Sequence, residues 1–296
     1  MELMRAAGVA EFGAADRLQI VEVPRPVPGP GEVLVRVRAA GVQPADVAVR
    51  SGWLPPGAPP VEFPVVPGNE FAGVVEGTGQ EVAGFRTMRC YAEYVAVPET
   101  QIVPKPEGVD WATAGALSAS GQTAHTALER LGLQTGETLL VHGAAGGVGT
   151  MITQLAVLRG VRVVGTGSAA NQEYLRGLGA VAVEYGDGEL ERLRRHGPFD
   201  AALDAAGHGS LHTSIELVTD RTRIGAIADW QLAQELGCRW IGSDRNQARL
   251  AELLDLVAAG RLAVTVRATY TLEEAFKAHA DIETGHGRGK VVLIVG

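Results

Sequence analysis

Cysteine is scarce in this 296-residue sequence, which contains only Cys90 and Cys238. Neither lies in a CxxC pair or has a histidine at metal-ligand spacing, so neither a disulfide framework nor a zinc site is predicted. The sequence also lacks any run of about 20 apolar residues, the length of a membrane span. Residues 1–5 lack the apolar core of a secretory signal. We therefore expect a cytoplasmic protein with no membrane partner.

An excess of positive charge is missing as well. The sequence has 26 Lys and Arg against 34 Asp and Glu, a formal net charge of −8 and a pI of about 5.4. This balance argues against nucleic acid as a partner, so any binding of phosphate groups must be local. The length and the 46% of hydrophobic residues allow a large core and two domains.

A glycine-rich stretch at residues 138–150, TLLVHGAAGGVGT, is the most informative part of the sequence. Its apolar start, its glycines and the apolar residues at helical spacing up to Leu158 predict a strand, a tight turn and a helix. A second strand predicted at 161–166 follows at the βαβ spacing of a nucleotide-binding half. A turn that binds nothing is the alternative, and this context favours the nucleotide site.

The glycines of this stretch have separate expected roles. Gly143 permits the sharp turn, and Gly149 lets the helix pack close to its strand. Gly146 and Gly147 let the backbone approach a pyrophosphate. The N-terminus of the helix then offers N–H groups and a positive dipole end to the phosphates.

The N-terminal part of the chain consists of short β-like runs at 18–23, 32–38, 64–76 and 90–97. The proline-rich segment 24–30 forbids regular structure and forms a rigid connection. We therefore expect an antiparallel β domain at the start of the chain.

Strands and helices alternate after two helices predicted at 110–117 and 121–130. Such alternation predicts a parallel sheet covered by helices on both faces. Beyond the strand at 161–166, the predicted elements are helix 170–178, strand 181–184, helix 188–195, strand 200–204, helix 210–217 and strand 222–227.

The C-terminal segment, with helices at 246–259 and 272–284 and a strand at 290–295, is expected to rejoin the N-terminal β domain. The prediction is an α/β protein of two domains. Residues 1–111 and 263–296 form the β domain, and residues 112–262 form the parallel-sheet domain.

Five motifs occur in order over almost the whole chain: 39–42 (AAGV), 67–75 (PGNEFAGVV), 91–95 (YAEYV), 142–149 (HGAAGGVG) and 287–293 (GRGKVVL). Together they resemble the medium-chain dehydrogenase/reductase superfamily, in particular its zinc-independent quinone oxidoreductase-like branch. The resemblance implies a GroES-like β domain made from both chain ends, a doubly wound Rossmann domain between them, and NAD(P)H as cofactor.

Zinc-dependent members of this superfamily place a cysteine near the position of Gln43 and a histidine at that of Asn69, and they carry a four-cysteine lobe. This sequence has none of these ligands. Glu70 is present, but one carboxylate cannot hold a zinc ion that takes about four ligands. We therefore predict no metal.

Rossmann domains that prefer NAD place an acidic residue at the end of the second strand. Residues 165–171 contain none, which opens the site to the 2′-phosphate of NADPH. The resemblance assigns this phosphate to Ser168, Asn171 and Tyr185, with Arg288 or Lys290 as additional contacts. Helix capping is the alternative role for Ser168 and Asn171. Asp204 ends a predicted strand, as either a cofactor contact or a loop cap.

The resemblance implies a larger set of NADPH contacts. Relatives often carry a lysine or arginine near the position of Asn171, and this sequence has neither there. The predicted cofactor-binding residues are Thr123, Gly143, Ala145, Gly146, Gly147, Val148, Gly149, Ser168, Asn171, Tyr185, Ala206, Ala228, Arg288 and Lys290.

Reduction by hydride without a metal needs an acceptor that delocalises charge, such as a quinone or a carbonyl-conjugated double bond. The catalytic candidates are Gln43 and Asp46. Gln43 either stabilises a developing oxyanion or is an ordinary polar residue at a strand end. Asp46 is expected to hold a turn or orient a neighbour, because an unperturbed carboxyl is ionised at neutral pH. The predicted substrate-side residues are Trp53, Asn69 and Trp230.

The sequence departs from the family pattern after Phe85. The family continues there through a turn, a strand and a variable loop, whereas this sequence reaches Tyr91 through residues 86–90 alone. Either the substrate side is shortened or a mobile loop is missing from the sequence.

The resulting prediction is an NADPH-dependent, zinc-independent reductase of a small quinone or enone. The alternatives are an enoyl reductase of a biosynthetic pathway and, from another class, an NADPH-binding sensor or structural protein with little turnover. Residues 236–241 form a plausible edge strand, so a homodimer is expected.

Overall fold

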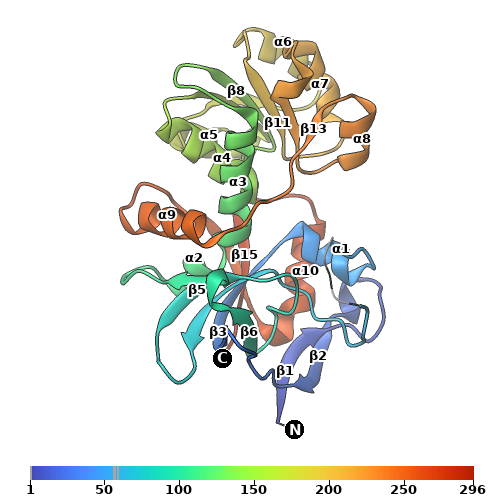
Figure 1. The fold of residues 1–296 in the computed structure, drawn as a ribbon. Helices are drawn as coiled ribbons and strands as arrows, with labels where there is room; N and C mark the ends of the chain where they lie inside the picture. The colour runs from blue at the N-terminus through green and yellow to red at the C-terminus, as the bar shows by residue number, and fades with distance from the viewer. Residues whose placement is uncertain (1, 56–57, 59) are drawn as a thin grey trace. The chain divides into compact units, whose positions relative to one another are not determined.

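The computed structural model describes residues 2–55, 58 and 60–296 and divides into two compact units (Figure 1). The first unit contains the chain up to Ala119 together with Arg245–His286 and Lys290–Gly296. The second contains Ser120–Asp244 and Gly287–Gly289. Both ends of the chain therefore belong to one unit, and the predicted mixed α/β fold is confirmed.

The first unit is built on a largely antiparallel sheet of seven strands in the order β14-β15-β3-β4-β5-β7, with β6 paired to β3. β15 pairs antiparallel with β3, with Val291 opposite Val42, so the end of the chain joins the sheet as predicted. β1 and β2 form a separate antiparallel pair. The strands are β1 (Leu3–Gly8), β2 (Gln19–Pro24), β3 (Glu32–Val42), β4 (Glu70–Val75), β5 (Glu81–Phe85), β6 (Tyr94–Pro98), β7 (Ile102–Pro104), β14 (Val266–Thr271) and β15 (Lys290–Ile294).

The core of the first unit includes Val35, Phe71, Tyr91 and Leu293, and the helices α1 (Pro44–Arg50) and α10 (Ala275–Glu283) contribute residues to it. The other helices of this unit are α2 (Trp111–Gly115) and α9 (Gln247–Ala258), and short 3-10 turns lie at Ala15–Arg17, Glu99–Gln101 and Leu272–Glu274. The units divide at 119/120 and 244/245, where the sequence suggested 111/112 and 262/263. α9 groups with the first unit because Gln247 Nε2 donates to the Ile102 carbonyl, at 2.7 Å.

The second unit is a parallel sheet in the order β10-β9-β8-β11-β12-β13. β8 comes first in the sequence, so the order reverses between β8 and β11, as in doubly wound nucleotide-binding sheets. The strands are β8 (Thr138–His142), β9 (Arg162–Gly167), β10 (Val181–Glu184), β11 (Ala201–Asp204), β12 (Ile224–Ala226) and β13 (Arg239–Trp240). The helices are α3 (Ser118–Leu131), which begins in the first unit, α4 (Gly147–Leu158), α5 (Gln172–Gly177), α6 (Glu189–Arg194), α7 (Ser210–Leu217) and α8 (Trp230–Glu235), with 3-10 turns at Ala169–Asn171 and Arg221–Arg223.

The short connection at residues 86–90, between Phe85 and Tyr91, is a tight turn in the first unit. β5, to which the sequence analysis assigned no strand, ends at Phe85, and Met88 and Arg89 then take positive φ angles of 65° and 69°. The N–H groups of Arg89 and Cys90 donate to the carbonyls of Val66 and Gly68. These bonds pack the turn against the loop that leads into β4.

Among the described residues, no helix is long and apolar enough to cross a membrane.

A buried histidine makes the stability of the first unit sensitive to acid. His279 on α10 is fully buried, and neither of its ring nitrogens has a hydrogen-bond partner in the described part of the chain. Burial, followed by the nearby charge of Arg50, lowers the pKa of His279 from 6.5 to about 3. As the pH falls below 6.5, His279 therefore binds a proton in the unfolded chain but stays neutral in the folded chain. The free energy of unfolding decreases as a result.

We expect His279→Leu to remove this part of the acid sensitivity. The wild type should lose about 2 kcal/mol between pH 7 and pH 5 through this one group, whereas the variant should not. Guanidinium unfolding of both proteins at the two pH values measures the difference. His212→Leu, at an exposed histidine, is the matched control. An equal pH dependence in H279L and wild type would contradict the assignment.

Candidate active site

The glycine turn between β8 and α4 has the geometry of a phosphate-binding loop. Gly143 has a φ of +71°, and a Cβ at Gly149 would lie 2.2 Å from the carbonyl oxygen of Gly143. The predicted sharp turn and close helix packing are therefore confirmed. A Cβ at Gly146 would meet only the Gly143 oxygen, at 3.4 Å, so this face of the loop is open.

α4 begins directly behind this open face. Its N-cap is Gly146, which has no side chain to bond to the N–H groups of the first turn. The N–H groups of the first turn of α4 and the positive end of the helix dipole suit the binding of an anion. The turn therefore fits the pyrophosphate of a dinucleotide, and the cofactor role of Gly143, Ala145 and 146–149 stays a prediction.

The segment after β9 carries the residues predicted to bind the 2′-phosphate. Neither Ser168 nor Asn171 makes a side-chain cap bond to the helix that follows. Instead, Asn171 Nδ2 donates to Ser168 Oγ at 3.2 Å. The capping alternative is thus not what these side chains do here. Tyr185, just past β10, is half-exposed, and its N–H donates to the Gly167 carbonyl at 3.3 Å.

Gly287–Gly289 returns to the glycine turn within the second unit. The N–H of Gly289 donates to the Ala145 carbonyl at 2.9 Å, and Gly289 forms an isolated parallel bridge with Gly146. The Arg288 guanidinium lies 5.1 Å from the centre of the Tyr174 ring. The structure thus brings Arg288 beside the predicted phosphate loop.

The remaining second-unit predictions are spread over several elements. Thr123 lies on α3, while Ala206, Ala228 and half-exposed Trp230 follow β11 and β12. Asp204 caps its loop, because its Oδ1 accepts from the N–H groups of residues 206 and 207 and from the Ser210 hydroxyl. Of the two roles considered for Asp204, the structure shows the loop cap.

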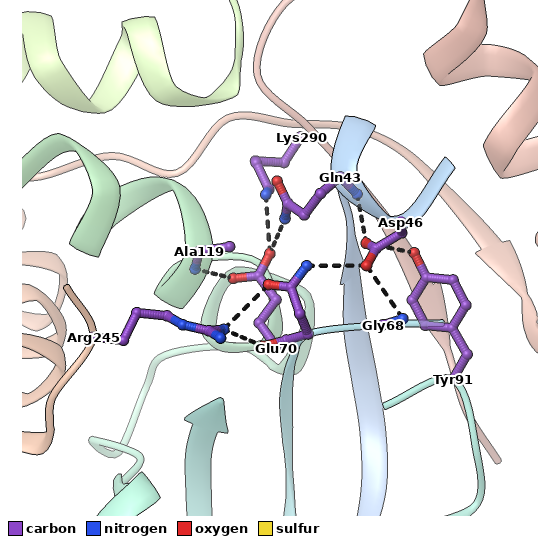
Figure 2. Close-up of polar contacts among 9 residues, drawn as sticks. Gln43, Asp46, Gly68, Glu70, Tyr91, Ala119, Arg245 and Lys290 are labelled. Atoms are coloured by element: carbon purple, nitrogen blue, oxygen red, sulfur yellow. Dashed lines mark hydrogen bonds and ion pairs between the residues drawn. The ribbon is translucent and has the colours of Figure 1, made fainter. Parts of the chain in front are cut away.

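A buried polar network in the first unit joins the catalytic candidates Gln43 and Asp46 to Asn69, one of the substrate-side candidates (Figure 2). Glu70 at the start of β4 is fully buried. Its Oε1 accepts from Lys290 Nζ at 2.9 Å and from Gln43 Nε2, and its Oε2 accepts from the Ala119 N–H at 2.6 Å. Lys290, predicted as a cofactor contact, therefore places its ammonium on Glu70. The carboxylate is held by one positive charge and two uncharged donors.

Asp46 holds the backbone around this network. It forms a capping box with Gln43 at the start of α1. It also accepts from the Gly68 N–H at 3.2 Å, Asn69 Nδ2 at 3.0 Å and the Tyr91 hydroxyl at 3.0 Å. Burial raises the pKa of Asp46 to about 6, against the effect of its hydrogen bonds. Asp46 both holds the turn and orients neighbours, the two structural roles that the sequence suggested.

Arg245 and Tyr91 are the members of the network that the sequence analysis did not identify. Arg245 Nη1 donates to the backbone oxygen of Asn69 at 2.8 Å and to its Oδ1 at 3.3 Å. Asn69 is therefore held between Asp46 and the Arg245 guanidinium. Burial lowers the pKa of Arg245. Tyr91 lies in the motif at 91–95, whereas nothing in the local sequence marks Arg245. Trp53 lies outside these contacts, and its side chain is half-exposed.

The chemistry of this donor set does not suit zinc. Within the part of the chain that the structure describes, no group of three or more His, Cys, Asp and Glu could hold a metal ion. Gln43 and Asn69 offer neutral amides, and Glu70 is already bonded to Lys290. Zinc independence remains a prediction.

The reversed order of the parallel sheet and the glycine turn define a dinucleotide-binding α/β protein with an attached β unit. Comparison with known proteins agrees. The model of the alcohol dehydrogenase GroES-like domain matches residues 29–107, and that of the zinc-binding dehydrogenase matches residues 178–293.

Three relatives cover nearly all of the chain. The 2-methylene-furan-3-one reductase of Solanum lycopersicum is 28% identical over 314 residues, which cover 98% of this chain and 79% of the reductase. The structure of the quinone oxidoreductase from Coxiella burnetii is 29% identical, with a TM-score of 0.87 and 100% of both chains covered. That of a probable oxidoreductase from Mycobacterium abscessus is 30% identical, with a TM-score of 0.82 and 99% of both chains covered.

The chain belongs to the medium-chain dehydrogenase/reductase superfamily, in its quinone oxidoreductase-like branch. It is a nicotinamide-dependent oxidoreductase, as predicted.

The alignment to the tomato reductase spans 314 positions, more than the 296 residues of this chain, so this chain has gaps in the alignment.

Proposed function

We propose that the enzyme reduces a small quinone or α,β-unsaturated carbonyl compound with NADPH and without zinc. The names of the relatives support this class of acceptor, because one is a reductase of a methylene-furanone and another a quinone oxidoreductase. Both acceptors can spread incoming charge onto a conjugated carbonyl oxygen. When bound, the cofactor supplies the hydride.

The proposal of NADPH over NADH rests on the residues at the C-terminal end of β9. Ser168 and Asn171 bond to each other there, and residues 162–171 include no carboxylate. A carboxylate at this position binds the ribose hydroxyl of NADH and repels a 2′-phosphate. The Arg288 guanidinium lies against the ring of Tyr174 on α5, the helix that follows this end of β9, and it adds a positive charge that favours the 2′-phosphate.

The substrate-side proposal rests on Gln43. A carboxamide has two N–H donors. One of those of Gln43 is bonded to Glu70, and the other is proposed to stabilise the developing oxyanion of the substrate. Lys290 holds Glu70 in place, and Asp46 holds the backbone of Gln43. The residues proposed to line the substrate side are Trp53, Asn69 and Trp230.

The enzyme is further proposed to act as a homodimer. β13 is the edge of the parallel sheet, and 40% of the Trp240 surface on it is exposed. Pairing of two such edges would satisfy their free backbone groups.

Titration with NADPH and NADH by cofactor fluorescence, followed in the same cuvette by a panel of quinones and enones, tests the proposal. We expect tighter binding of NADPH and its oxidation by one class of acceptor. Tight binding without oxidation by any acceptor would favour a sensor, and the absence of binding would contradict the assignment of the glycine turn. Repeating the assay after treatment with a chelator tests zinc independence.

A further inference from the structure

Arg288 has a backbone held by its neighbour Gly289 and a side chain that is exposed to solvent. It lies between Gly287 and Gly289, which have φ angles of 121° and 68°, and its side chain is exposed. The bond from the Gly289 N–H to the Ala145 carbonyl fixes the backbone beside the glycine turn. A long exposed side chain loses rotamer freedom when it binds a ligand, so its contribution depends on preorganisation.

Tyr174 on α5 provides that preorganisation. Its partly buried ring receives the Arg288 guanidinium at 5.1 Å, within the range of a cation–π interaction. Its hydroxyl lies 3.2 Å from Thr150 Oγ1 on α4, and Thr150 Oγ1 donates to the Ala145 carbonyl at 3.2 Å. The ring under Arg288 is thus tied to the same carbonyl that fixes the Arg288 backbone.

α5 also follows the β9 end that carries Ser168 and Asn171. The guanidinium on Tyr174 is therefore a positive charge held against the helix that follows the predicted 2′-phosphate position. We infer that Tyr174 is a positioning residue that fixes Arg288 for the 2′-phosphate and so determines the preference for NADPH over NADH. This inference rests on the proposed function.

Calorimetric titration with 2′,5′-ADP and 5′-AMP tests the inference without turnover, because the two probes differ only in the 2′-phosphate. We expect Tyr174→Leu to weaken the binding of 2′,5′-ADP about tenfold and that of 5′-AMP less than about twofold. Tyr174→Phe keeps the ring under Arg288 and loses only the hydroxyl contact with Thr150, so it should retain most of the preference. Arg288→Gln should weaken 2′,5′-ADP at least as much, and adding Y174L to R288Q should have no further effect.

Tyr94→Leu is the matched control, because it removes a ring that lies 4.2 Å from the Arg25 guanidinium in the first unit. It should leave both affinities unchanged. Equal weakening of both probes by Y174L would show a merely structural role and overturn the inference. A wild type that prefers 2′,5′-ADP together with an unaffected Y174L would overturn the inference alone. A wild type without that preference would overturn the proposed NADPH specificity as well.

Discussion

Replacing Lys290 with methionine should lower the free energy of unfolding by about 3–5 kcal/mol. The Lys290 ammonium and the Glu70 carboxylate are 2.9 Å apart, with 2% and 0% of their side-chain surfaces exposed. Removal of the ammonium leaves a buried carboxylate with only the uncharged donors of Gln43 and Ala119. Denaturant unfolding at pH 7 measures the loss.

Two further variants separate the charge pair from simple truncation. Adding Glu70→Gln to Lys290→Met removes both charges and should recover most of the loss. Lys277→Met, which breaks an exposed pair with Glu274, should change stability by less than about 0.5 kcal/mol. A K290M protein as stable as wild type would show that this pair does not stabilise the first unit.

Gly149→Ala should disrupt the nucleotide loop and destabilise the second unit by about 3 kcal/mol. The new Cβ would lie 2.2 Å from the Gly143 oxygen and 2.7 Å from the Ala144 Cα, both backbone atoms that cannot rotate away. α4 must therefore shift from the turn whose N–H groups are proposed to hold the pyrophosphate. We expect NADPH affinity to fall by more than about tenfold, as measured by cofactor fluorescence.

Gly177→Ala is the matched control for this change. Gly177 also lies on a helix of the second unit, but a Cβ there has no heavy atom within 4 Å. The variant should keep NADPH affinity and gain a few tenths of a kcal/mol in stability. Normal NADPH binding by G149A would refute the role of the glycine turn.

The fold was predictable because local patterns specify most of it. Parallel strands buried on both faces appear as apolar runs such as 139–141, and the glycine turn marks where the first of them ends. β5 was not predicted, because its small residues Ala83 and Gly84 give little alternation. Gly84 is needed there, since a Cβ would lie 2.5 Å from the Phe71 ring.

The substrate-side network was only partly predictable. Asn69 was recognised within the motif at 67–75, and Gln43 and Asp46 from the segment that follows the motif at 39–42, but the partners of these residues come from distant parts of the chain. Arg245 is 176 residues from Asn69. Lys290 was assigned to the cofactor through the family resemblance of its motif at 287–293. Its pairing with Glu70, 220 residues away, depends on β15 lying beside β3, which no local pattern reveals.

Transfer of deuterium from NADPH dideuterated at C4 of the nicotinamide to an enone, by chelator-treated enzyme, tests the central claim most directly. The account predicts one deuterium at the β-carbon of the reduced product, detected by mass spectrometry. NADPH that binds but neither transfers deuterium to an enone nor is oxidised by a quinone, or oxidation that returns only when zinc is added, would contradict it.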